Sequence, residues 1–135
     1  MSEAVFVDSG ILIAFLNARD QWHQQAAALF ALGNVRWCTS FLVVSEAYSW
    51  FLHRHGEEAA RALRGLVDNL DGLRIFGVDA NHHREVLKML DRLRGAKLTY
   101  VDASSLSLME RHKIRKAWAT DHHLGLTGAE VLPRT

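Results

Sequence analysis

Residues 4–8 read Ala-Val-Phe-Val-Asp, a short apolar run that ends in an acid. Two later stretches have the same form, LTYVD at residues 98–102 and AWATD at residues 117–121. Short apolar runs bounded by polar residues are typical of buried strands. We therefore expect strands over 4–7 and 117–120, with Asp8 and Asp121 at their ends. Asp102 either ends a short extended segment or opens a helix.

The rest of the chain continues this alternation of elements. Residues 35–38, 73–78 and 130–132 are further candidate strands. Apolar residues with a period near 3.6 predict helices over 25–32, 40–55, 57–70 and 80–93. Strands that alternate with helices are typical of a mostly parallel sheet covered by helices on both faces. The sequence contains no repeat or linker, so we expect one α/β domain over residues 1–135.

Composition excludes several classes of protein. An apolar fraction of 49% with 23% charged residues rules out a disordered or fibrous chain. A single cysteine, Cys38, excludes an internal disulfide and a four-cysteine zinc site. The uncharged run at residues 9–18 is far shorter than the roughly 20 residues of a membrane-spanning helix. No secretory signal is recognisable, so we expect a cytoplasmic protein without membrane contact.

The net charge of +1 is unevenly distributed along the chain. Residues 1–83 contain six Lys and Arg against nine Asp and Glu, whereas residues 84–135 contain ten against six. This excludes a uniformly basic coat for nucleic acid but is compatible with a basic face beside an acidic patch. The candidates for phosphate contacts are Arg111, His112, Lys113, Arg115, Lys116, His122 and His123.

The three acids at the ends of apolar runs have two explanations. The carboxyl ends of parallel strands meet at one edge of a sheet, where open sheets bind their ligands. Asp8, Asp102 and Asp121 would then lie together. Aspartate is also a favoured helix N-cap, and a helix-like stretch follows each of the three. For any one of them alone, both explanations stay open.

Glu46 favours a shared site. Leu42 and Trp50 lie four residues before and after it in the predicted helix 40–55, which puts its carboxylate on the inward face. An ionised carboxylate there is costly without a cation or several donors. Four carboxylates with no thiolate suit Mg²⁺ or Mn²⁺. Such a site can bind a phosphodiester and activate a water molecule.

In their sequence contexts the four acids resemble the acidic quartet of PIN-domain ribonucleases, above all the small VapC-type toxins of toxin–antitoxin pairs. The contexts are VFVDSG, SFLVVSEAYSW, LTYVDASSL and AWATDHHL, and the resemblance spans nearly the whole chain. It implies a five-stranded parallel sheet flanked by helices and metal-dependent cleavage of RNA, often tRNA or rRNA. It also implies a homodimer and a cognate antitoxin whose C-terminal segment lies across the active site.

The resemblance also implies a role for each site residue. Asp8, Asp102 and Asp121 would be ligands of Mg²⁺ or Mn²⁺, and Glu46 a further ligand or a group that positions water. Ser9 would form a hydrogen bond within the acidic cluster. The sequence departs from the family where it has Ala119 in place of a frequent hydroxyl residue and His123 in place of a frequent acid. These departures leave one and two metal ions both possible.

Other functions fit the sequence less well or stay open. A phosphoacceptor domain needs paired acids after the first strand, and a haloacid-dehalogenase-like phosphatase needs an acid two residues after Asp8, where Gly10 stands. A non-catalytic module that binds RNA or an antitoxin stays open, because sequence does not measure turnover. A housekeeping RNA-processing nuclease also stays open, because a partner gene is not visible in this chain.

Overall fold

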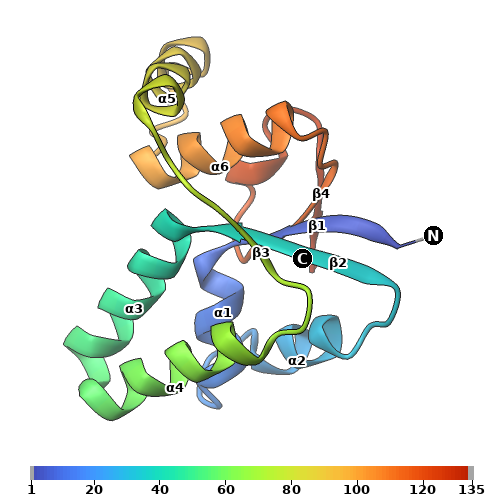
Figure 1. Cartoon of the computed structure of the whole chain (residues 1–135), viewed down its shortest axis with the longest axis vertical. Helices are drawn as coiled ribbons and strands as arrows, with labels where there is room; N and C mark the ends of the chain where they lie inside the picture. Colours follow the sequence, from blue (N-terminus) through green and yellow to red (C-terminus); the bar gives the residue numbers. More distant parts are fainter. Residues whose placement is uncertain (1, 134–135) are drawn as a thin grey trace.

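Five parallel strands form the centre of the computed structural model, which describes residues 2–133 (Figure 1). The strands are β1 (Glu3–Val7), β2 (Val35–Ser40), β3 (Arg74–Phe76), β4 (Lys116–Trp118) and β5 (Glu130–Leu132). Their order in the sheet is β3-β2-β1-β4-β5, and each neighbouring pair is parallel. The predicted α/β fold with a five-stranded sheet is therefore confirmed.

Helices cover both faces of this sheet. Within residues 2–133 they are α1 (Ser9–Leu16), α2 (His23–Phe30), α3 (Phe41–His55), α4 (Glu57–Asn69), α5 (Ala80–Arg92) and α6 (Tyr100–Arg111), with a short 3₁₀ turn η1 (His123–Gly125). Helices α5 and α6 lie on one side of the sheet and α1 to α4 on the other (Figure 1). None of these helices is long and apolar enough to cross a membrane.

Local sequence explains where the helices begin and end. The Ser40 hydroxyl accepts a hydrogen bond from the Val43 backbone N–H at 3.1 Å and so caps α3. Gly56, with φ of 91°, ends α3 and begins α4. One prediction was wrong: a helix does not follow Asp121, where the chain forms only the single turn η1.

The core lies around the central strand. Val5, Phe6 and Val7 of β1 are each at most 1% exposed, and Trp118 of β4 is fully buried. A strand buried on both faces is expected at the centre of a parallel sheet. Trp50, by contrast, is only partly buried at the margin of the core.

A buried hydrogen bond joins α5 and α6, the two helices that share one side of the sheet. Nε2 of His82 in α5 lies 2.7 Å from Oγ of Ser104 in α6, and both side chains are at most 2% exposed. Burial lowers the pKa of His82, with the charge of Arg111 in the same direction. Neutral His82 therefore favours the folded state. The free energy of unfolding falls as the pH drops below 6.5, because the unfolded chain binds the proton at a higher pH than the folded chain does.

Ser104→Ala tests this bond. We expect a loss of about 1–3 kcal/mol in the free energy of unfolding at pH 7.5, because a buried imidazole nitrogen is left unpaired. Ser107→Ala is the matched control, since the hydroxyl of Ser107 is buried on the same helix without a hydrogen-bond partner. Denaturant unfolding of both variants measures the difference. Equal effects would mean that the His82–Ser104 bond contributes nothing.

Candidate active site

The acids lie where the order of the strands changes direction. Within the sheet, β2 and β3 lie on one side of β1, and β4 and β5 lie on the other side of β1. Asp8 directly follows β1, and its backbone N–H donates to the carbonyl oxygen of Trp118 at 2.9 Å. Asp121 follows three residues after Trp118. A crevice at such a switch point is the usual ligand site of an open parallel sheet.

Asp8 occupies the N-cap position of α1, yet its side chain makes no capping hydrogen bond. The side chain is largely buried, with the residue 7% exposed. A buried carboxylate without a capping role is not explained by helix formation. The capping explanation therefore fails for Asp8.

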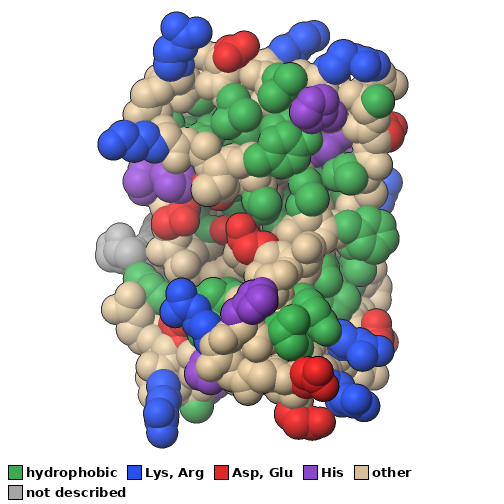
Figure 2. Space-filling view, turned by 90° about the vertical axis from the view of Figure 1, so that its left-hand side faces the viewer, with side chains coloured by type: hydrophobic (Ala, Val, Ile, Leu, Met, Phe, Trp, Pro, Cys, Tyr) green, Lys and Arg blue, Asp and Glu red, His purple; other side chains and the backbone are tan. Residues whose placement is uncertain are grey.

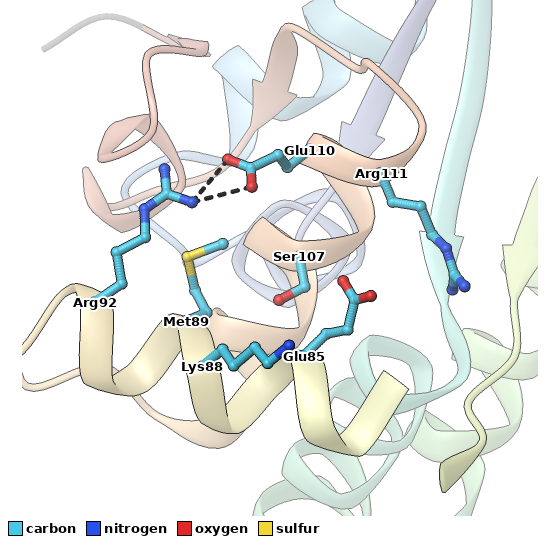
Figure 3. A pocket seen from close by; sticks show the side chains of 7 residues that line it. All are labelled: Glu85, Lys88, Met89, Arg92, Ser107, Glu110 and Arg111. Carbon is cyan, nitrogen blue, oxygen red and sulfur yellow. Dashed lines mark hydrogen bonds and ion pairs between the residues drawn. The ribbon is translucent and has the colours of Figure 1, made fainter. Parts of the chain in front are cut away.

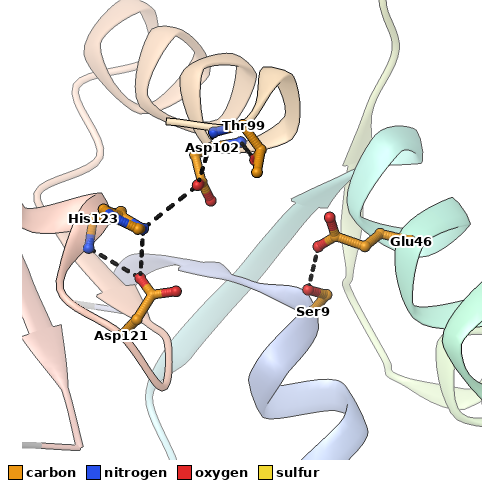
Figure 4. A network of polar contacts seen from close by, with 6 residues as sticks. All are labelled: Ser9, Glu46, Thr99, Asp102, Asp121 and His123. Atoms are coloured by element: carbon orange, nitrogen blue, oxygen red, sulfur yellow. Dashed lines mark hydrogen bonds and ion pairs between the residues drawn. The ribbon is translucent and has the colours of Figure 1, made fainter. Parts of the chain in front are cut away.

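Asp102 is partly explained by helix capping. It opens α6 rather than ending a strand, and it forms a capping box with Thr99. The Thr99 backbone N–H donates to Asp102 Oδ2 at 3.3 Å, and the Asp102 backbone N–H donates to Thr99 Oγ1 at 3.1 Å. This pairing holds the carboxylate over the end of the sheet (Figure 4).

Glu46 accepts a hydrogen bond from the hydroxyl of Ser9 (Figure 4). The expectation that its side chain faces inward was wrong, because Glu46 is exposed. The buried seam of α3 runs through Val43, Ala47 and Phe51. The neighbouring stripe of α3 is only partly buried and consists of Leu42, Glu46 and Trp50. Glu46 therefore reaches the site from its solvent side.

Electrostatic coupling links the four acids. Burial raises the pKa of Asp8 to about 7, and the negative charges of Glu46, Asp102 and Asp121 add to the rise. A hydrogen bond from the Ser9 backbone opposes it. The structure thus brings all four predicted acids to one edge of the sheet, where their charges are not compensated. An added cation would relieve this repulsion.

His123 completes the cluster from the turn after β4. Its Nδ1 lies 3.5 Å from Asp102 Oδ2 and 3.4 Å from Asp121 Oδ1 (Figure 4). The backbone N–H of His123 also donates to Asp121 Oδ1 at 3.0 Å. From the sequence, His123 was a possible phosphate contact, like His122, and a departure from the family pattern, but not a neighbour of Asp102 and Asp121. An aspartate side chain often accepts a hydrogen bond from the backbone N–H two residues later, and this bond forms a turn. That tendency of Asp121 is the sequence signal that could have placed His123 here.

The basic stretch is not brought to the acids. Lys116 begins β4, so it lies at the end of the strands opposite to the acids. There it pairs with Glu3 at 3.0 Å and with Glu130 at 3.5 Å. Arg111 ends α6, about 14 Å along the helix axis from Asp102. Arg111 and Lys116 therefore do not lie beside the acids. A contact between them and RNA stays a prediction.

Arg111 lines a depression between α5 and α6 instead (Figure 3). That depression also contains Arg92, which donates from Nη1 to both carboxylate oxygens of Glu110 at 3.0 and 3.1 Å. Glu85 adds a second acid. Lys88 adds a third base, so basic and acidic side chains are mixed in this depression (Figure 3).

Figure 2 shows the face of the molecule on which the strands end. Acidic side chains gather near the centre of this face, and Lys and Arg side chains lie toward its margins. An extended polyanion laid over this face would meet negative charge at its centre and positive charge at its margins. Only a cation at the centre makes that arrangement favourable.

The donors at the centre suit a divalent cation. Over residues 2–133, no three His, Cys, Asp or Glu side chains are close enough to hold a metal ion as they stand. The carboxylates are nevertheless uncompensated, and the buried Nδ1 of His123 has no hydrogen-bond partner. The Asp121 side chain is 50% exposed, so its carboxylate has room to turn toward an ion.

Comparison with known proteins assigns the family. The profile of the PIN domain matches residues 5–128. The chain belongs to the PIN domain family. Residues 8, 46, 102 and 121 all fall within the matched region, so the resemblance inferred from the four acids is confirmed at the level of the family.

This PIN domain is similar over nearly its whole length to VapC20 of Mycobacterium tuberculosis, a 23S rRNA-specific endonuclease. The two are 29% identical over 130 residues, which cover 96% of this chain and 98% of VapC20. The crystal structure of VapC20, a Sarcin-Ricin loop cleaving toxin, superposes with a TM-score of 0.85 at 28% identity over 93% of this chain and 95% of that one.

More distant structures share the fold of this PIN domain. VapBC2 from Rickettsia felis, bound to a DNA fragment from its promoter, gives a TM-score of 0.70 at 13% identity and covers 95% of this chain and 96% of that one. A toxin–antitoxin complex from Klebsiella pneumoniae gives 0.63 at 16% identity and covers 96% of each chain.

Proposed function

We propose that this protein is a metal-dependent endoribonuclease of one domain over residues 1–135, with Asp8, Glu46, Asp102 and Asp121 as its active site. The observation that carries the proposal is the buried Asp8, whose pKa is raised to about 7 beside three further acids. Carboxylates whose pKa is strongly raised by burial and by neighbouring negative charges are concentrated at functional sites. Mg²⁺ or Mn²⁺ supplies the missing positive charge.

Each acid has a distinct part in this proposal. Asp8, Asp102 and Asp121 would hold the ion, and a divalent ion bound there would supply charge stabilisation for the phosphodiester and activation of a water molecule. Glu46 orients the attacking water, because the Ser9 hydroxyl holds its carboxylate facing the other three acids. The fixed position of Thr99 keeps Asp102 in place while RNA binds.

We further propose that the substrate is ribosomal RNA and that the protein is the toxin of a toxin–antitoxin pair. Support comes from VapC20, whose name gives its substrate as 23S rRNA and which is similar to this chain over 96% of its length. Four clustered carboxylates also attract a guanidinium group. An antitoxin segment with an arginine would thus occupy the acidic site. A cytoplasmic homodimer is the form we propose for the free toxin.

The substrate is tested by incubating the purified full chain with intact ribosomes and, separately, with total tRNA. We expect discrete fragments of the large ribosomal RNA and intact tRNA, with the cut mapped by sequencing of fragment ends. Fragments from tRNA alone would support the proposed nuclease activity but would contradict ribosomal RNA as the substrate. Intact RNA of both kinds, with Mg²⁺ and with Mn²⁺ present, would contradict the proposed activity.

A further inference from the structure

We propose that His123 is a nitrogen ligand of the metal site and shifts its preference from Mg²⁺ toward transition-metal ions such as Mn²⁺. The inference rests on the proposed function, since it concerns the same site. It starts from an atom that the fold otherwise leaves unexplained. Nδ1 of His123 is buried and has no hydrogen-bond partner, although the side chain as a whole is 26% exposed.

The position of Nδ1 is that of a ligand rather than of a hydrogen-bond donor. It lies 3.5 Å from an oxygen of Asp102 and 3.4 Å from an oxygen of Asp121, and neither contact qualifies as a hydrogen bond. Two ligand atoms bound to one ion at about 2.1 Å lie roughly 2.9–3.4 Å apart, depending on the coordination geometry. The two measured separations lie near the upper end of this range, so Nδ1 and each carboxylate oxygen are spaced much as two ligands of one ion would be.

The backbone holds His123 in this place. Its N–H donates to Asp121 Oδ1 at 3.0 Å, so the turn and one of the acids are joined. The neighbouring His122 is exposed and has no comparable contact with the acids among the described residues. Geometry thus assigns the ligand role to one of two adjacent histidines.

The chemistry of the nitrogen decides which ion gains. Mg²⁺ binds oxygen ligands and requires near-ideal octahedral geometry. Imidazole suits transition-metal ions better, so one nitrogen among the carboxylates favours Mn²⁺ over Mg²⁺.

Electron spin echo spectroscopy of the protein with bound Mn²⁺ tests the contact directly. We expect a ¹⁴N coupling typical of a coordinated imidazole in the wild type. The coupling should vanish in His123→Gln and persist in His122→Gln, the matched control. Since the wild-type spectrum needs no substitution, a folding defect in a variant does not affect the central result.

Calorimetric titration with each ion measures the preference. We expect His123→Gln to weaken Mn²⁺ binding by about 10-fold or more while Mg²⁺ binding changes far less. His123→Asp should restore affinity, with the ratio of the two dissociation constants shifted toward Mg²⁺. Thermal unfolding in EDTA checks that both variants are folded.

The outcomes separate this inference from the proposed function. Mn²⁺ binding and RNA cleavage without a ¹⁴N coupling would overturn the role of His123 alone. A coupling that persists in His123→Gln would also overturn it, because another histidine would be the ligand. A wild-type protein that binds neither ion would overturn both proposals together.

Discussion

We expect Asp8→Asn to reduce RNA cleavage severely and to raise the stability of the metal-free protein at pH 8. The loss of activity should be about 10³-fold, equivalent to about 4 kcal/mol of transition-state stabilisation, because the proposed ion would lose a ligand. The gain in stability follows from burial, since the side chain of Asp8 is ionised at pH 8 beside three other acids. Few substitutions of a structural residue would have these two opposite effects.

The pH dependence gives the sign of the stability change. The folded-state pKa of about 7 lies above the ordinary value of 3.8, so between these values the folded chain holds a proton that the unfolded chain has lost. The contribution of Asp8 to stability is therefore full below pH 3.8 and is lost as the pH rises through 7. Asparagine does not ionise, so the advantage of Asp8→Asn grows over this range to at most about 4 kcal/mol.

Denaturant unfolding in EDTA at pH 4, 6 and 8 measures this difference. Asp68→Asn is the matched control, because Asp68 is exposed on α4 and the chemical change is the same. We expect the control to cleave RNA at the wild-type rate and to unfold within about 0.5 kcal/mol of the wild type at each pH. A less stable Asp8→Asn protein at pH 8 would show that the carboxylate is not held unfavourably.

We expect Gly10→Ala to destabilise the protein and slow cleavage, although alanine favours a helix. A β-carbon at Gly10 in α1 would overlap Oγ1 of Thr120 and lie 3.3 Å from two of its carbon atoms. Thr120 is β-branched and partly buried, so it has few other rotamers. We expect a loss of about 1–3 kcal/mol in stability. Cleavage should fall about 10–100-fold because the adjacent Asp121 is displaced.

Two further variants isolate that contact. Gly65→Ala in α4 has no atom within 4 Å of the added carbon, so it should stabilise the protein by about 0.5–1 kcal/mol. Thr120→Ala combined with Gly10→Ala should recover most of the lost stability, because the overlapping oxygen is gone. Urea unfolding and initial cleavage rates measure these effects. A stable, fully active Gly10→Ala protein would contradict a tight contact between α1 and the Asp121 loop.

The fold could be predicted because local signals agree along the chain. Within the apolar run at residues 4–7, residues 5–7 are buried as part of the central strand, and Ser40 and Gly56 bound α3 as cap and stop. Strand ends differ from the predicted ranges by one or two residues, since pairing rather than composition determines where a strand ends. The alternation of elements was sufficient for a parallel sheet.

The structure brings the four predicted acids together, but parts of the geometry around them were not predicted. Glu46 is exposed because its stripe on α3 borders the buried seam, and periodicity alone does not separate the two. Lys116 lies at the far edge because it begins β4, which strand direction already requires. The place of His123 depends on a turn in which its backbone N–H donates to Asp121, a turn that the aspartate favours but that was not used in the prediction.

The most direct test of the account is single-turnover cleavage of ribosomal RNA by protein stripped of metal. We predict no cleavage in EDTA, return of discrete fragments when Mn²⁺ or Mg²⁺ is added in excess, and no return with Asp8→Asn. Cleavage by the wild type that is unchanged in EDTA, or that Asp8→Asn retains at the wild-type rate, would contradict the claim that the four acids form a metal-dependent nuclease site.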